Sequence, residues 1–141
     1  MINILTGINA TSSALEAERI RMEVISQNIA NANTLNDGTG KPYQRQQVVF
    51  EKLLGQQAGM TGAGETGIQV SRIETDRRPP RMVFNPGHPK ADATGMVGMP
   101  DINIHEEMAD LMVASRAFEA NLAVVRNART MALQTLSIGK R

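Results

Sequence analysis

The chain has 141 residues, enough for one domain with extensions but too few for two full enzyme domains. Its 15 basic and 14 acidic side chains leave a formal net charge of +1, so no overall field favours nucleic acid or an acidic membrane surface. The lack of cysteine excludes disulfides, thiolate metal sites and cysteine nucleophiles. With three phenylalanines, one tyrosine and no tryptophan, we do not expect a dense aromatic core.

The N-terminal segment, residues 1–36, carries an apolar stripe that repeats every seven residues. The main row consists of Ile8, Leu15, Met22 and Ile29. A weaker second row consists of Ile4, Ile25 and Ala32. A stripe sustained over about four repeats predicts an amphipathic helix over about residues 4–32. The segment lacks a basic n-region, and polar residues interrupt its apolar ones, so we expect no cleavable secretory signal.

The middle of the chain, residues 37–100, contains all six prolines and ten of the twelve glycines. Such punctuation predicts a β/loop region rather than long helices. Short β-compatible runs cover residues 46–50, 67–73 and 81–84, and a loop rich in Gly, Gln and Ala covers 55–67. We expect residues 85–100 to be turn-rich and extended.

The C-terminal segment, residues 101–141, repeats the helical pattern. One apolar row consists of Leu111, Phe118, Val125 and Ala132. The second row consists of Met108, Leu122 and Leu136. Asn103 is a candidate N-cap with Glu106 three residues later, as in a capping box. The acidic residues that follow complement the positive end of the helix dipole.

These patterns predict a mainly α fold with a small β/irregular middle, in which the two long terminal helices pair as a coiled-coil-like bundle. An isolated amphipathic helix gains most of its stability from packing, so neither stripe is satisfied alone. The helices can pair within one chain, parallel or antiparallel, or both stripes can also pack on neighbouring copies, and the pattern favours neither. The predicted assembly seam consists of Ile8, Leu15, Met22, Ile25, Ile29, Met108, Leu111, Phe118, Leu122, Val125 and Leu136.

Candidate sites for catalysis are weak, and we expect no catalytic residue, metal or cofactor. Neither His88 nor His105 has metal-ligand spacing. A small hydrolase could be built on Glu106, Glu107 and Asp110, but acidic residues in the first turns of a helix are favoured by the dipole without catalysis. No nucleophile elbow or phosphate-binding loop is present.

An alternative function is that of a small helical nucleic-acid-binding protein. Clustered arginines contact phosphates, and Arg77, Arg78 and Arg81 form the best such cluster. The balanced charge and the single nearby aromatic, Phe84, argue against this alternative. A solvated loop or an ion pair between subunits is the more ordinary interpretation of these arginines.

Three stretches carry a family resemblance. Residues 26–34 read Ser-Gln-Asn-Ile-Ala-Asn-Ala-Asn-Thr, residues 85–89 read Asn-Pro-Gly-His-Pro, and residues 114–121 read Ala-Ser-Arg-Ala-Phe-Glu-Ala-Asn. In this order, they resemble the rod proteins of the bacterial flagellar basal body, and among these the short subunits of the proximal rod. The resemblance covers almost the whole chain.

The resemblance implies a structural subunit rather than an enzyme. It implies export by the flagellar type III apparatus, without a cleaved signal peptide, and assembly into a hollow rod that spans the periplasm. The implied partners are copies of the chain itself, other rod subunits, the inner-membrane ring with its adaptor, and the export apparatus, with no nucleic acid and no small-molecule substrate. Inter-subunit register contacts are expected from Asn28, Asn31 and Asn121, although asparagines near residues 28–31 are also typical of a frayed helix end.

Overall fold

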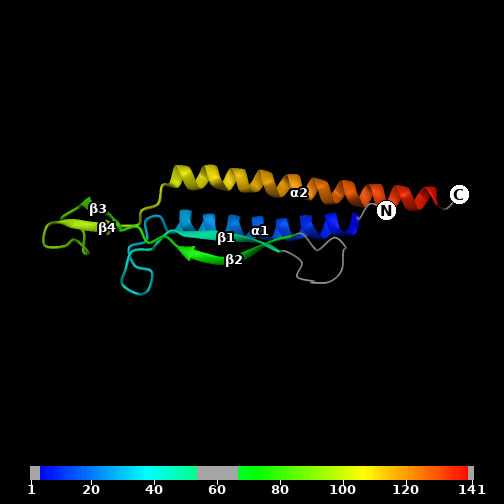
Figure 1. Cartoon of the computed structure of the whole chain (residues 1–141). Coiled ribbons are helices and arrows are strands. Elements are labelled where there is room, and N and C mark those ends of the chain that lie inside the picture. Colours follow the sequence, from blue (N-terminus) through cyan, green and yellow to red (C-terminus); the bar gives the residue numbers. More distant parts are fainter. Residues whose placement is uncertain (1–3, 54–66, 140–141) are drawn as a thin grey trace, which may run out of the picture.

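The computed structural model describes residues 4–53 and 67–139. Within these ranges the chain is mostly α-helical, with a small antiparallel β middle between two long helices (Figure 1). In chain order the elements are helix α1 (Ile4–Ala30), strands β1 (Gln46–Leu53), β2 (Gly67–Thr75), β3 (Arg81–Phe84) and β4 (Met96–Met99), and helix α2 (Ile104–Ile138). Most of the loop expected at 55–67 lies outside the described residues.

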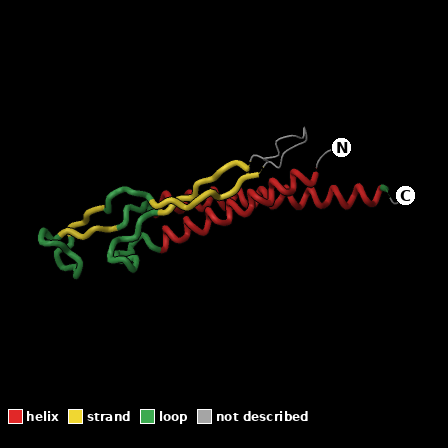
Figure 2. Tube along the Cα trace, turned by 60° about the horizontal axis from the view of Figure 1, so that its bottom comes forward, coloured by secondary structure: helices red, strands yellow, loops and turns green. Residues whose placement is uncertain are grey.

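The two helices pack side by side and run in opposite directions, so the start of α1 and the end of α2 lie at the same end of the molecule (Figure 1). Of the two pairings that the sequence allowed within one chain, the structure therefore has the antiparallel one. Helix α1 also packs on β1 and β2, which places it between α2 and the β1–β2 hairpin. The β3–β4 hairpin projects beyond the helices at the end opposite to the termini (Figures 1 and 2).

The helix ends follow local chemistry. Helix α1 ends at Ala30, two residues before the predicted end, and a turn begins where the amide of Asn31 donates to its own helix, at Gln27 O. Asn103 caps α2 as predicted, because its side-chain oxygen accepts a hydrogen bond from the backbone N–H of His105 at 3.2 Å. Neither described helix is long and apolar enough to cross a membrane.

The middle forms two separate two-stranded antiparallel sheets. Strand β1 pairs with β2 from Gln46 opposite Thr75, with an irregularity in register between Val49 and Phe50. Strand β3 pairs with β4 over four residues of each strand. The β-compatible runs at 46–50, 67–73 and 81–84 are confirmed, since each lies within a strand.

Residues 96–99 agree with the expectation of a turn-rich, extended segment at 85–100, and the structure adds that they form strand β4, paired with β3. The turn before it allows the pairing. Gly95 has a φ of +77°, and a Cβ there would stand 3.0 Å from Phe84 Cε2. A side chain at this position would therefore be strained and would collide with the facing strand. Val97 then becomes buried, with 4% of its surface exposed.

The apolar core of the described residues is small. Its buried members are Ala17, Val24, Ile25, Ala32, Val97 and Ala114. The predicted seam is buried unevenly, since Ile25 is buried, Met108 and Leu136 are exposed, and the remaining seam residues are half-buried. Many apolar side chains of α2 are exposed, namely Ile104, Met108, Met112, Val113, Val124, Met131, Leu133, Leu136 and Ile138.

Candidate assembly site

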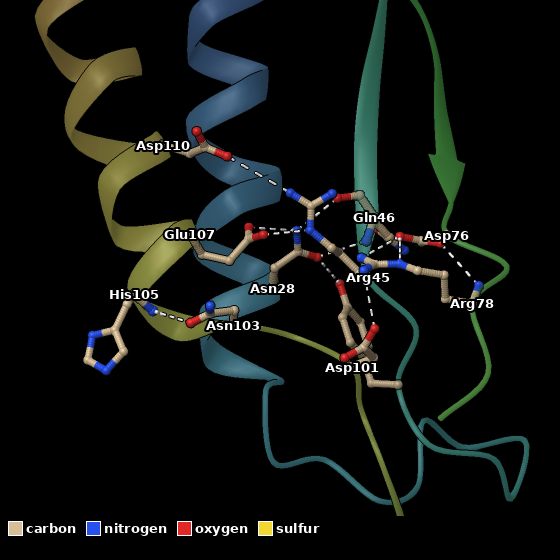
Figure 3. Close-up of polar contacts among 11 residues, drawn as sticks. Asn28, Arg45, Gln46, Asp76, Arg78, Asp101, Asn103, His105, Glu107 and Asp110 are labelled. Carbon is tan, nitrogen blue, oxygen red and sulfur yellow. Dashed lines mark hydrogen bonds and ion pairs between the residues drawn. The ribbon is translucent and has the colours of Figure 1, made fainter. Parts of the chain in front are cut away.

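A buried polar cluster joins α1, the start of β1 and the first turns of α2 (Figure 3). Asn28, on the last turns of α1, is completely buried, yet its carboxamide is fully hydrogen-bonded. Its Nδ2 donates to Gln46 O at 2.8 Å and to Glu107 Oε2 at 3.0 Å. Its Oδ1 accepts from Gln46 N at 2.9 Å and from the Tyr43 hydroxyl at 3.1 Å. The amide therefore satisfies all its donors and acceptors within the chain.

Glu107 is the second buried member of the cluster, with 2% of its surface exposed. Its Oε1 accepts from Arg45 Nε at 2.6 Å, while its Oε2 accepts from Asn28. Arg45 retains some exposure and also approaches Asp110, with NH2 3.9 Å from Oδ2. A carboxylate this deep in the fold is tolerated because it is both paired and hydrogen-bonded.

Tyr43 is half-buried and contacts this cluster through its hydroxyl, which donates to Asn28 Oδ1. Burial, and secondarily the negative charge of Glu107, raise the pKa of the Tyr43 phenol above its ordinary value. The phenol therefore stays protonated and remains a hydrogen-bond donor to Asn28 over the whole neutral range.

The acidic residues proposed for a hydrolase do not converge on a common point. Glu107 is buried in the cluster and Glu106 is exposed, while Asp110 lies near Arg45 (Figure 3). Among the described residues, no group of three or more His, Asp or Glu side chains is placed to hold a metal ion. The ring of His88 accepts from the backbone N–H of Lys90 at 3.1 Å, within its own turn.

Of the three arginines of the nucleic-acid alternative, Arg78 is paired with acidic residues of its own chain. Arg78 pairs with Asp76 at 2.8 Å and with Asp101 at 3.2 Å. The backbone N–H and the guanidinium of Arg78 lower the pKa of Asp76, so this carboxylate stays ionised at neutral pH. The charge of Arg78 is therefore used within the chain, which corrects its assignment as a phosphate contact.

The other two register asparagines lie outside the cluster. Asn31 accepts from the Thr34 hydroxyl at 3.1 Å, which stabilises the turn after α1. Asn121 lies half-buried on α2. Contacts of Asn31 and Asn121 with a neighbouring subunit stay predictions.

The sequence missed Tyr43 and Gln46 as partners of Asn28, and Arg45 as the partner of Glu107. The helix dipole alone favours an acidic residue at position 107, in the first turn of α2. The sequence therefore gave no reason to expect that Glu107 is buried and paired. Its pairing with Arg45 depends on how the loop returns from α1, and no periodic pattern of the sequence records that path. The only available signal was the nearness of Tyr43 and Arg45 to the asparagine-rich turn.

Comparisons with known proteins agree at both ends of the chain. Residues 8–36 match the family described as flagella basal body rod protein, and residues 93–138 match the C-terminal family of the flagellar basal body rod FlgEFG proteins. The chain is 37% identical to the flagellar basal-body rod protein FlgC of Yersinia enterocolitica, over 99% of the chain and 100% of that protein. It is 35% identical to FlgC of Borreliella burgdorferi, over 97% of the chain and 98% of that protein. It is 34% identical to FlgC of Bacillus subtilis, over 95% of the chain and 97% of that protein.

Proposed function

The chain belongs to the FlgC family of flagellar basal-body rod proteins, and we propose that it builds the proximal part of the rod by packing its terminal helices against neighbouring subunits. It is a structural subunit of the basal-body rod and not an enzyme. The alternative of nucleic-acid binding is set aside, because neither the relatives nor the paired Arg78 supports it.

The observation that carries the proposal is the unequal burial of α2. One side of this helix packs on α1, while nine large apolar side chains elsewhere on it remain exposed. Exposed apolar side chains in this number on one helix are typical of a protein-binding surface. We assign this face, together with the half-buried seam residues, to coiled-coil-like contacts with copies of the chain and with other rod subunits.

The assembly mechanism follows from the small core. Six buried apolar residues, five of them alanine or valine, give a helical pair of modest stability within one chain. Packing of the exposed face on a neighbour would add stability by mass action, so folding and assembly are coupled. A head-to-tail contact that does not close on itself would produce an open helical tube.

The remaining assignments rest on the family. We propose that residues 1–36 and 101–141 form the axial core of the rod and that residues 37–100 face outward. We also propose a location in the periplasm-spanning rod, contact with the inner-membrane ring and its adaptor at the proximal end, and type III export without a cleaved signal peptide. Asn31 and Asn121 are assigned to polar contacts that set the register between subunits.

A substitution at Phe118 tests the proposal. Phe118 is half-buried in the middle of the α2 seam, so Phe118→Asp would place a charge where two helices must meet. We expect the variant to be exported but to be absent from isolated basal bodies, and the cells to be non-motile. Phe118→Leu keeps the seam apolar and should retain motility. Normal rods and motility with Phe118→Asp would overturn the proposal.

A further inference from the structure

The contacts of Glu107 make the pairing of the two helices depend on a third segment of the chain. One carboxylate oxygen is held by Asn28 of α1 and the other by Arg45, which lies just before β1 (Figure 3). Asn28 in turn needs the backbone N–H and C=O of Gln46 to complete its hydrogen bonds. Closing α1 on α2 without residues 43–46 in place would therefore bury one charge without its partner.

We propose that Asn28, Arg45 and Glu107 form a latch that closes this end of the helical pair only when the segment at residues 43–46 has docked. A buried carboxylate that loses its cation is far more costly than an exposed ion pair that breaks. The latch thus couples the β1–β2 hairpin to α2, although the two lie on different sides of α1. This coupling is a property of the single chain and holds or fails independently of rod assembly.

Removing the two charged partners should have unequal effects. Arg45→Met leaves the Glu107 carboxylate buried at 2% exposure with only Asn28 as a hydrogen-bond partner. Glu107→Gln leaves Arg45 with partial access to water and with Asp110 nearby, so its charge is still solvated. We therefore expect the two helices to separate much more often in Arg45→Met than in Glu107→Gln. In the double variant, which has no buried charge, we expect the helices to pair again.

A single engineered thiol can report on this opening. Ala114 is completely buried on α2, about two helical turns beyond Glu107, and α1 is the described element that packs on α2. The sequence contains no cysteine, so Ala114→Cys would supply the only thiol for iodoacetamide, which alkylates thiols much faster than other side chains. Its alkylation rate, relative to the rate in denaturant, measures how often the helices separate. Amide hydrogen exchange at Ala114 in the unsubstituted background checks that the added sulfur does not itself loosen the pair.

In this background, Arg45→Met should raise the alkylation rate roughly 100-fold, as expected for loss of a partner from a buried ion pair. Adding Glu107→Gln should return the rate to within about 10-fold of the parent, because the buried charge is then gone. Arg78→Met is the matched control, since Arg78 is 57% exposed and its two ion pairs, with Asp76 and Asp101, lie at the surface, and its rate should stay within about 3-fold of the parent.

Three results would overturn the latch. The first is an alkylation rate in Arg45→Met that equals the rate in the parent. The second is an alkylation rate that stays as fast in the double variant, Arg45→Met with Glu107→Gln, as in Arg45→Met alone. The third is alkylation of the parent at the rate seen in denaturant, which would mean that the pair is open in the single chain. Should Arg45→Met fail to fold, recovery of the folded chain by added Glu107→Gln would support the latch, and failure to recover would contradict it.

Discussion

The carboxamide of Asn28 forms the same pair of hydrogen bonds with Gln46 that the backbone of a neighbouring strand would form. It donates to the C=O of Gln46 and accepts from the N–H of the same residue, and so occupies the place of a strand partner at the start of β1. The two remaining positions on the amide bind Glu107 and Tyr43. Because each position is used, the residue aligns three segments at once and leaves no buried polar atom of its own unsatisfied.

The sequence identified Asn28 through the family resemblance but assigned its amide to a neighbouring subunit. The structure has its four hydrogen bonds within the chain instead, so the register that Asn28 sets is that of α1 against β1 and α2. The residue type and its position along a helix show that an amide is available for hydrogen bonding. They do not show which segment of the folded chain supplies its partners.

Asn28→Asp should destabilise the chain strongly. The carboxylate is the same size, but it loses both donors and places a second negative charge beside Glu107 Oε2, which lies 3.0 Å from the present Nδ2. We expect a loss of about 3 kcal/mol or more in the free energy of unfolding, measured by urea denaturation.

Asn31→Asp is the matched control for this measurement. It also adds a charge near the C-terminal end of α1, but the Asn31 amide donates to Gln27 O in an exposed position. Its cost should stay below about 1 kcal/mol. Equal losses in the two variants would contradict the role given to Asn28.

At the scale of elements, the sequence predicts the helices well and the sheet partners less well. Both apolar stripes extend over several heptads, so a few interrupting polar residues do not hide them, and α1 ends within two residues of the expected position. Strand β4 has only four residues, and its pairing depends on the turn that brings it back to β3. A short strand of this kind carries no period of its own and is recognisable only with its partner.

Asp92 stabilises the turn between β3 and β4. Its Oδ1 accepts from the Thr94 hydroxyl at 2.6 Å, from Thr94 N at 2.8 Å and from Met96 N at 2.9 Å. These bonds, that of the Thr94 hydroxyl first, lower the pKa of Asp92 below its ordinary value. A lowered pKa in the folded state means that the stabilisation is present above the unfolded-state pKa and is lost as the pH falls through the folded-state value.

The turn should therefore loosen at acid pH. The amide signals of Thr94 and Met96 in ¹H–¹⁵N spectra should move together, with a midpoint below the ordinary aspartate pKa of about 3.9. Asp92→Asn keeps the acceptor oxygen without the titration, so the same signals should be insensitive to pH in that variant. A midpoint at or above the ordinary value would contradict the assignment.

The whole molecule has two unlike ends. At one end, the latch joins the two helices, and the β3–β4 hairpin extends beyond them. At the other end, α2 is the longer helix, with 35 residues against 27 in α1, a difference of about 12 Å in length. Its last turns carry exposed Met131, Leu133, Leu136 and Ile138. A chain whose two ends differ in this way is suited to head-to-tail assembly.

Leu136→Glu separates assembly from the stability of the single chain. Leu136 is 70% exposed, so the substitution should change the free energy of unfolding of the purified chain by less than about 0.5 kcal/mol. In cells it should reduce or abolish recovery of the chain in isolated basal bodies, because the charge would be buried when a neighbour covers α2. Gln134→Glu adds the same charge at an exposed polar position of the same turn and should be recovered as the parent is. Equal recovery of Leu136→Glu and the parent would show that the end of α2 is not covered in the rod, and the assembly face would then be restricted to the part of the helix nearer Phe118.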